Sequence, residues 1–348
     1  MTHHTPFCYT HFRILLLIIS FVCLKPVSLK RVPDRCYRFP DNGVGNVPAR
    51  NALIVRQSST KISEFRTISD AVKALQKLSG PQQIFIYPGT YKEQMIADYE
   101  HPLLIQGFSP STRSFVRNTV FITEARSLGS TGSDSKSSVL WAKSSCFEMR
   151  NVNVINSFGS GSDTQAVALT AEGEQQVFKA CVFSSYQDTL YIKATRAYFN
   201  KCLIQGTVDF ICGPGTAWFE KAQIAVKKPL HSSTITAQKS GSTVQTRFVF
   251  NKCRILGLNG TPPHTTYLGR PWSSYAAVTY QFCDFSNIIH PEGWSAWKTD
   301  RPNTEHIQFE EFSNTGLGAG RRRRFGRMLN QPRTIESVLG AEFILWAV

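Results

Sequence analysis

Two aspartates recur at matching positions in consecutive repeats of this sequence. Residues 178–191 read FKACVFSSYQDTLY and residues 199–212 read FNKCLIQGTVDFIC, so Asp188 lies over Asp209 when the segments are superposed on their cysteines. Two carboxyl groups brought close together cannot both ionise freely, so we expect one pKa to be raised and the other to stay low. Such a pair is suited to provide a general acid and a nucleophile.

The residues around the aspartates favour this chemistry. Gln187 precedes Asp188, and Gln165 lies about one repeat earlier, so two amide donors could converge on the pair. Arg270, in YLGRPW, is a fixed cation able to hold a carboxylate ionised, and Trp272 offers a flat face to a sugar. Stacked aspartates can also bind calcium or cap turns. A calcium site would gather more acidic ligands, so we expect no metal.

The repeat continues along the chain and predicts a solenoid. The cysteine position of the repeat recurs through the segments WFEKAQI, VFNKCRI and TYQFCDF, and falls at residues 181, 202, 222, 253 and 283. Such self-similarity is typical of repeat architectures. The runs are short, β-branched and aromatic, with almost no helical periodicity. We therefore expect an all-β fold, a right-handed parallel β-helix.

Stacking in a β-helix predicts internal ladders, because each residue lies about 4.8 Å from its equivalent in the next coil. The repeated aromatic position predicts a core ladder of Phe178, Phe199, Phe219, Phe250 and Tyr280. The cysteine positions predict a second ladder. Stacking brings Cys181 near Cys202, but bond geometry decides whether they form a disulfide, so that question stays open.

The N-terminal part is expected to contain three segments. The apolar run ILLLIISFVCL has the length of a signal-peptide core, so residues 1–28 predict a secretory signal, with a membrane anchor or a buried strand as alternatives. Residues 29–52 would be an irregular lead-in, and residues 53–348 the β-helix domain. TISDAVKALQKL (67–78) predicts a short capping helix. We place it before the first strand, over the open end of the stack.

Net charge and cysteine content limit the possible binding partners and the state of the thiols. The formal net charge is +15, which suits a polyanionic partner, either an acidic polysaccharide or nucleic acid. Secretion favours the polysaccharide, so we expect no nucleic-acid partner and no membrane association after signal removal. The run GRRRRFGR (320–327) reads as a solvated face or a disordered loop. Seven cysteines remain beyond the signal, so at least one thiol should be free, and none has zinc-binding spacing.

Five motifs, in order, resemble the signature set of pectin methylesterases. They are GTYKEQ (89–94), QAVAL (165–169), YQDTL (186–190), GTVDFI (206–211) and LGRPW (268–272). The resemblance runs from about residue 54 to residue 346 and is closest to fungal-type members without a pro-domain. It implies a secreted, extracellular carboxylic ester hydrolase that needs no cofactor and removes methyl esters from homogalacturonan (pectin), in cell-wall modification or degradation. We expect a monomer.

The resemblance also implies a role for each candidate residue. Asp209 would be the nucleophile and Asp188 the general acid and base. Gln165 and Gln187 would stabilise the oxyanion, and Arg270 would orient Asp209. Trp272 and Tyr191 would line the sugar groove.

The sequence departs from the family pattern near Asp209. Family members commonly read DFIFGNA where this chain reads DFICGPG, so Cys212 replaces an aromatic that lines the groove and becomes a candidate free thiol. Pro214 and Gly215 replace the following pair. Catalysis should survive, while subsite preference should change. Ala222 replaces a frequent cysteine, which excludes a disulfide from Cys202 to that coil.

Other functions fit the sequence less well. A pectin lyase would need an acidic calcium site with a basic proton abstractor, and a polygalacturonase a larger set of acids. A serine esterase of the GxSxG type is excluded because that motif is absent. A catalytically silent pectin-binding β-helix is the remaining alternative. Loss of either aspartate or of Arg270 would have favoured it, and all three are present.

Overall fold

The computed structural model describes Met1, Cys36, Phe39 and residues 47–160, 164–193, 196–320 and 322–347. Contacts divide the chain into Met1–Arg31 and Val32–Val348, and the fold described below is that of the second unit. Apart from Met1, the predicted signal (residues 1–28) lies outside the described residues, as does most of the lead-in. Within the described ranges, no helix is long and apolar enough to cross a membrane.

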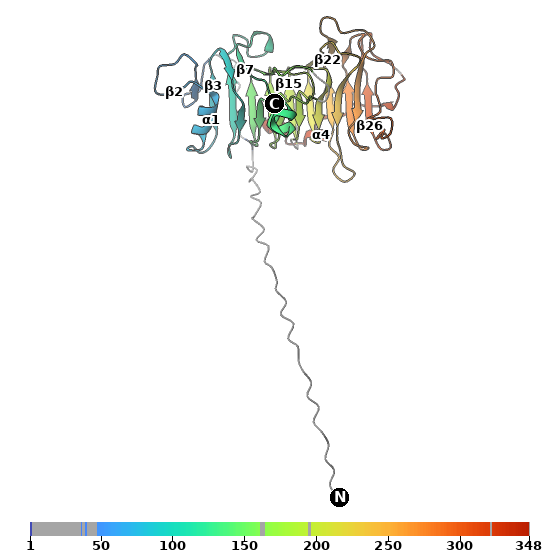
Figure 1. Ribbon diagram of the computed structural model, residues 1–348, viewed down its shortest axis with the longest axis horizontal. Coiled ribbons are helices and arrows are strands. Elements are labelled where there is room, and N and C mark those ends of the chain that lie inside the picture. The colour runs from blue at the N-terminus through green and yellow to red at the C-terminus, as the bar shows by residue number, and fades with distance from the viewer. Residues whose placement is uncertain are drawn as a thin grey trace. The chain divides into compact units, whose positions relative to one another are not determined.

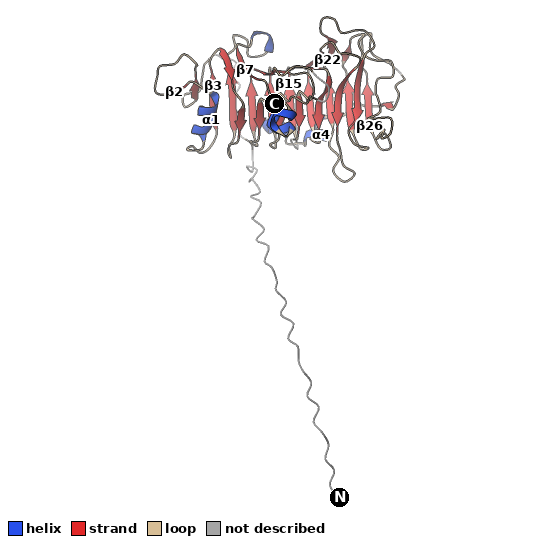
Figure 2. Cartoon of the chain, viewed as in Figure 1, coloured by secondary structure: helices blue, strands red, loops and turns tan. Residues whose placement is uncertain are grey.

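Three sheets of parallel strands make up this unit, and strands dominate the picture (Figure 2). Sheet A has the order β2 (Glu64–Phe65), β1 (Leu53–Val55), β3 (Gln82–Ile86), β6 (Leu103–Gly107), β9 (Phe147–Arg150), β12 (Gln176–Lys179), β15 (Ala197–Asn200), β18 (Ala217–Glu220), β21 (Phe248–Asn251), β24 (Ala277–Gln281), β26 (Gln308–Phe312) and β27 (Gly326–Met328). Sheet B has the order β25 (Asp284–Phe285), β22 (Arg254–Gly257), β19 (Gln223–Val226), β16 (Leu203–Gly206), β13 (Val182–Ser184), β10 (Val152–Asn156), β7 (Val120–Glu124) and β4 (Gly89–Lys92). Sheet C has the order β23 (Thr266–Pro271), β20 (Ser233–Gln238), β17 (Val208–Gly213), β14 (Leu190–Ile192), β11 (Leu169–Ala171), β8 (Leu140–Ala142) and β5 (Met95–Ala97).

Each central coil contributes one strand to each sheet in turn, so the chain winds as a right-handed parallel β-helix, as predicted. Successive coils are in register, as in Phe178↔Phe199 of β12 and β15. The corner from sheet A to sheet B is formed by one left-handed residue in each coil, at Ala180, Lys201, Lys221 and Lys252, with φ of 51° to 55°. The repeat length seen in the sequence is therefore the length of one coil.

The predicted aromatic ladder fills the core. Phe178, Phe199, Phe219, Phe250 and Tyr280 are all fully buried, and neighbouring rings stack with centroids 4.4 to 4.8 Å apart. Stacking follows from the coil spacing of about 4.8 Å, because aromatic pairs prefer ring centroids about 4.5 to 7 Å apart. The ladder aligns neighbouring coils and so fixes the register of sheet C, where the candidate site lies.

The cysteine ladder is also buried, and its thiols are free. Cys181, Cys202, Cys253 and Cys283 form no disulfide, which answers the open question about Cys181 and Cys202. Cys212 is free as well, as expected. The disulfide Cys36–Cys146 was not predicted, and it joins the N-terminal segment to the start of β9 in sheet A across 110 residues.

Helices lie at the margins of the coil. The predicted helix is α1 (Ile68–Leu75), where the Thr67 hydroxyl accepts a hydrogen bond from the Asp70 amide at 3.1 Å. It packs at the N-terminal end of the stack (Figure 1). Our placement before the first strand was wrong, because β1 and β2 precede it and β2 forms the edge of sheet A. The other helices are η1 (Phe115–Arg117), α2 (Leu128–Thr131), α3 (Asp134–Ser137), α4 (Ile335–Leu339) and α5 (Phe343–Trp346).

The two C-terminal helices, α4 and α5, pack against the outer face of sheet A near its middle strands. Leu339 of α4 and Trp346 of α5 form a second apolar cluster with Tyr198 and Trp218, whose side chains point away from the main core. This cluster explains why sheet A carries aromatic residues on both faces.

Candidate active site

Asp188 and Asp209 occupy neighbouring coils at the start of sheet C, as the repeat predicted. Gln187 forms a β-bridge with Val208, and the Asp188 amide donates to the Val208 carbonyl at 3.1 Å. Asp188 and Asp209 directly follow these two paired residues, so they lie side by side on neighbouring coils. Both have left-handed backbones, with φ of 58° and 47°. This conformation is costly outside glycine and is concentrated at functional sites.

A β-bulge positions Asp209. Val208 pairs with Thr234 but Ile211 pairs with Thr236, so β17 contains one residue more than β20 between these points. The extra residue lets Phe210 point fully into the core while Asp209 faces outward. Gly206 is needed beneath this turn, since a Cβ there would lie 2.2 Å from that of Phe210.

Arg270 holds Asp209 through both carboxylate oxygens. Its Nε donates to Oδ1 at 2.9 Å and to Oδ2 at 3.2 Å, and its Nη2 donates to Oδ2 at 2.6 Å. Arg270 lies two coils away on β23, in register with Ala237 and, through it, Cys212. A two-pronged arginine contact fixes the direction of a carboxylate as well as stabilising its charge.

The two carboxyls differ in their proton affinity. Burial, with the charges of Asp209 and Asp134, raises the pKa of Asp188 well above its usual value. Burial also raises the pKa of Asp209, although the Arg270 hydrogen bonds and charge oppose that rise. The expectation that one pKa of the pair would stay low was therefore wrong, because desolvation of Asp209 outweighs the effect of the arginine. The pair still supplies a more readily protonated Asp188 beside an arginine-bound Asp209.

The two glutamines lie on the coils beside the aspartates. Gln187 is adjacent to Asp188, and Ala166 donates its amide to the Gln187 carbonyl at 3.2 Å, which places Gln165 one coil away in register with Gln187. The Gln165 Oε1 atom is buried and has no hydrogen-bond partner in the described structure. Its amide group is therefore not tied to the protein through that oxygen.

Aromatic side chains flank the carboxyls. The Tyr191 and Trp272 ring centroids lie 6.4 Å apart, so the two residues predicted to line the sugar groove are neighbours. Trp297, which the sequence did not indicate, stacks 6.5 Å from Trp272, and its ring lies 4.5 Å from the Arg270 guanidinium carbon. Cys212 is in register with Tyr191 and is buried, so a small side chain stands where an aromatic was expected from relatives.

Asp134 is a third carboxyl near the site that the sequence did not reveal. It begins α3, and α2 just before it is tied to Gln165 by the Leu128 amide at 2.8 Å. Its Oδ1 is buried without a hydrogen-bond partner among the described residues, and burial raises its pKa. Asp134 lies in a segment outside the repeat, so no periodic signal could have identified it. Across the described residues, no group of three or more histidine, cysteine, aspartate or glutamate side chains could hold a metal ion.

Comparison with known proteins identifies the family. The family model described as Pectinesterase matches residues 53–336, which is most of the chain. The chain belongs to the pectinesterase family. It is accordingly a carboxylic ester hydrolase, as the motifs implied.

Pectinesterases of fungi are similar to this chain over most of their length. The pectinesterase of Aspergillus aculeatus is 36% identical over 303 residues, covering 85% of this chain and 90% of its own. The pectin methylesterase structure from Aspergillus niger superposes with a TM-score of 0.81 at 33% identity, covering 87% of this chain and 98% of that one. A pectin methylesterase crystallised with a hexasaccharide gives a TM-score of 0.73 at 28% identity, covering 85% and 98%.

Proposed function

We propose that this pectinesterase hydrolyses the methyl esters of polygalacturonate through a covalent intermediate on Asp209. The observation that carries the proposal is the Arg270 contact to both oxygens of Asp209, beside a second carboxyl whose pKa is raised much further. One carboxyl is thereby kept available as a nucleophile while its neighbour keeps a proton.

In the first step, an Asp209 oxygen attacks the ester carbonyl carbon. The carbonyl electron pair moves to oxygen, and amide N–H groups of Gln187 and Gln165 stabilise that oxyanion. When the tetrahedral intermediate collapses, the bond to the methoxy oxygen breaks and Asp188 donates its proton to that oxygen. Methanol leaves, and Asp209 is joined to the galacturonate carbonyl as an anhydride.

In the second step, Asp188 acts as a base. Its carboxylate takes a proton from water as the water oxygen attacks the galacturonyl carbon. Collapse of this intermediate releases Asp209 as a carboxylate and leaves a free galacturonic acid, which ionises. Asp188 is protonated again, so the cycle can repeat without a cofactor. Arg270 keeps Asp209 oriented in both steps.

The aromatic side chains beside the aspartates suit a sugar polymer as substrate. Tyr191 and Trp272 present aromatic faces beside the aspartates, and such faces pack against the apolar sides of sugar rings. A relative of this fold has been crystallised with a hexasaccharide. We propose methyl-esterified homogalacturonan as the substrate, acted on outside the cell after secretion, by a monomer that modifies or degrades plant cell wall. The domain boundaries at residues 28 and 52 are part of this proposal.

Methanol release from highly methylated pectin tests the reaction class. The proposal predicts methanol without a rise in absorbance from unsaturated products and without a rapid fall in viscosity. A rise in absorbance would instead identify a lyase, and a rapid loss of viscosity without methanol would identify a chain-cleaving hydrolase. Folded protein that binds pectin but releases no methanol at any pH would identify the silent binding module.

A further inference from the structure

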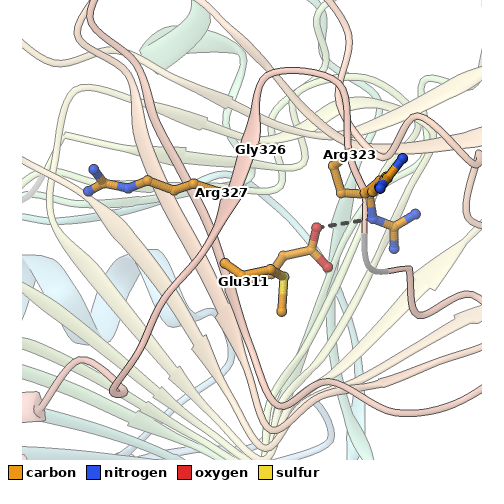
Figure 3. A pocket seen from close by; sticks show the side chains of 6 residues that line it. Glu311, Arg323, Gly326 and Arg327 are labelled. Atoms are coloured by element: carbon orange, nitrogen blue, oxygen red, sulfur yellow. Dashed lines mark hydrogen bonds and ion pairs between the residues drawn. The ribbon is translucent and has the colours of Figure 1, made fainter.

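The arginine run lines a cavity at the C-terminal end of the solenoid. The cavity measures about 360 Å³ and is lined by Glu311, Arg322, Arg323, Gly326, Arg327 and Met328, from β26, β27 and the segment between them (Figure 3). The sequence predicted a solvated face or a disordered loop here. Arg322, Arg324 and Arg327 are exposed, which agrees with the solvated face, and Arg321 lies outside the described residues.

Arg323 holds the cavity wall in place. Its side chain is 4% exposed and pairs with Glu311, which is 2% exposed, at 3.1 Å (Figure 3). It also donates to the Gly318 carbonyl at 2.7 Å and the Pro291 carbonyl at 3.2 Å. Because these bonds occupy its guanidinium, Arg323 stabilises the fold here. Any ligand would be bound by the neighbouring arginines.

The surrounding arginines outnumber their carboxylate partners. Arg247, Arg327 and Arg333 share the buried Glu310, and Arg324 reaches Glu292 at 3.5 Å. Arg322 is exposed, and among the described residues it has no ion-pair partner. Five arginines therefore share three carboxylates, Glu292, Glu310 and Glu311, and Arg322 adds a sixth positive charge, which leaves an excess positive charge around the cavity.

The arginine segment lies beyond the candidate active site along the solenoid axis. Arg324 donates its amide to the Glu292 carbonyl at 2.9 Å, and the Gly293 carbonyl accepts from Leu268 of β23. Trp294 in turn bridges to Gly269, the residue before Arg270. Along the solenoid axis, β20, β23 and then Trp294 follow the coil of Asp209. Trp294 is therefore three coil spacings of about 4.8 Å, or about 14 Å, from the Asp209 coil.

We propose that Arg322, Arg324 and Arg327 bind carboxylates of a de-esterified stretch of galacturonan. The identity of this ligand rests on the proposed function, because each hydrolysed ester leaves one carboxylate on the polymer. Planar guanidinium groups bind carboxylates through paired hydrogen bonds, and several of them close together in the chain suit a polymer with regularly spaced anions. A product stretch held here stays on the enzyme while the groove acts on methylated units farther along.

The test compares two variants that each remove two positive charges. Arg322→Gln/Arg324→Gln changes two exposed arginines of the run, of which Arg322 lines the cavity and Arg324 lies near it in the sequence. Lys201→Gln/Lys221→Gln is the matched control, since both lysines are exposed at the corner between sheets A and B. The dissociation constant for fully de-esterified polygalacturonate is measured at low salt for both and for the wild type. Methanol release from a short, fully methylated oligogalacturonate is measured in parallel.

The arginine variant should bind polygalacturonate about ten-fold more weakly, since exposed charge pairs contribute about two- to five-fold each. The lysine variant should lose less than about two-fold, and both should release methanol from the short substrate at the wild-type rate. Unchanged binding by the arginine variant, or an equal loss in the lysine variant, would overturn the proposal. An equal loss of heparin binding would overturn the galacturonan assignment. Absence of methanol from the wild type would contradict the proposed function alone, because binding of the product polymer needs no turnover.

Discussion

Arg270 and Asp209 lie 61 residues apart in sequence and two coils apart in the solenoid, yet they form the closest ion pair of the candidate site, at 2.6 Å. The coil between them places Ala237 beneath the arginine side chain, so the guanidinium reaches across that coil without obstruction. The pair is buried on the Asp209 side and half-buried on the Arg270 side. Its charge is therefore poorly screened, and the removal of one partner should be felt strongly by the other.

Replacement of Arg270 by glutamine should impair catalysis and change its pH dependence. Without the cation, the pKa of Asp209 rises further, so the acid limb of the kcat/KM profile should move to higher pH. The loss of orientation should lower kcat by about 10²-fold. Arg254→Gln removes an exposed arginine paired with Asp284 and serves as the control. An acid limb that stays in place in Arg270→Gln would show that Arg270 does not govern Asp209.

Replacement of Asp134 by asparagine should move the basic limb of the kcat/KM pH profile. The charge of Asp134 raises the pKa of Asp188, so its removal lowers that pKa and the basic limb of the kcat/KM profile should shift to lower pH. Asp300→Asn removes an exposed carboxylate and should leave the profile unchanged. A basic limb that moves equally in both variants, or in neither, would contradict this electrostatic role.

Asp188→Asn should make the protein more stable at neutral pH. The folded-state pKa of Asp188 lies above the unfolded value, so between these two values the folded state binds more protons and unfolding becomes easier as pH rises. Asparagine carries no such penalty. Calorimetry should give a higher Tm for the variant at pH 7 and equal Tm values near pH 4 or below. A lower Tm at pH 7 would mean that the Asp188 carboxylate stabilises the fold.

The Cys212 thiol should be inert although it lies in the candidate site. Burial and the charges of Asp188 and Asp209 raise its pKa well above the usual value, so almost no thiolate is present at pH 7. Treatment of the folded enzyme with iodoacetamide at pH 7 should leave methanol release unchanged. Mass spectrometry of the product checks modification directly. Rapid alkylation of Cys212 in the folded enzyme would contradict the assigned burial.

The parts of the fold that repeat could be predicted from the sequence. The aromatic ladder follows from equal residues at equal places in each coil, and the same register brings Asp188 beside Asp209. Arg270 was found because its motif suggests a cation for a carboxylate. The ladder and the aspartate pair depend on spacing and Arg270 on a local motif, and both are visible in one sequence.

The features that were not predicted depend on contacts made by segments that lie outside the sequence repeat. Asp134 and Trp297 approach the candidate site from segments outside the repeat, and Cys36 reaches Cys146 from the lead-in. The helices α4 and α5 pack on sheet A through Trp346 and Leu339, which look like ordinary apolar residues in the sequence. The pKa of Asp209 was misjudged for a related reason, because the degree of burial is a property of the assembled site.

Methanol release by Asp209→Asn tests the central claim most directly. The variant preserves the shape of the side chain and removes the nucleophile, and a thermal melt comparable with that of the wild type shows that it is folded. With highly methylated pectin as substrate, the proposed mechanism predicts that kcat falls by about 10⁴-fold or more, as for other essential nucleophiles. A folded Asp209→Asn protein that keeps more than about a tenth of the wild-type rate would contradict the assignment of Asp209 as the nucleophile.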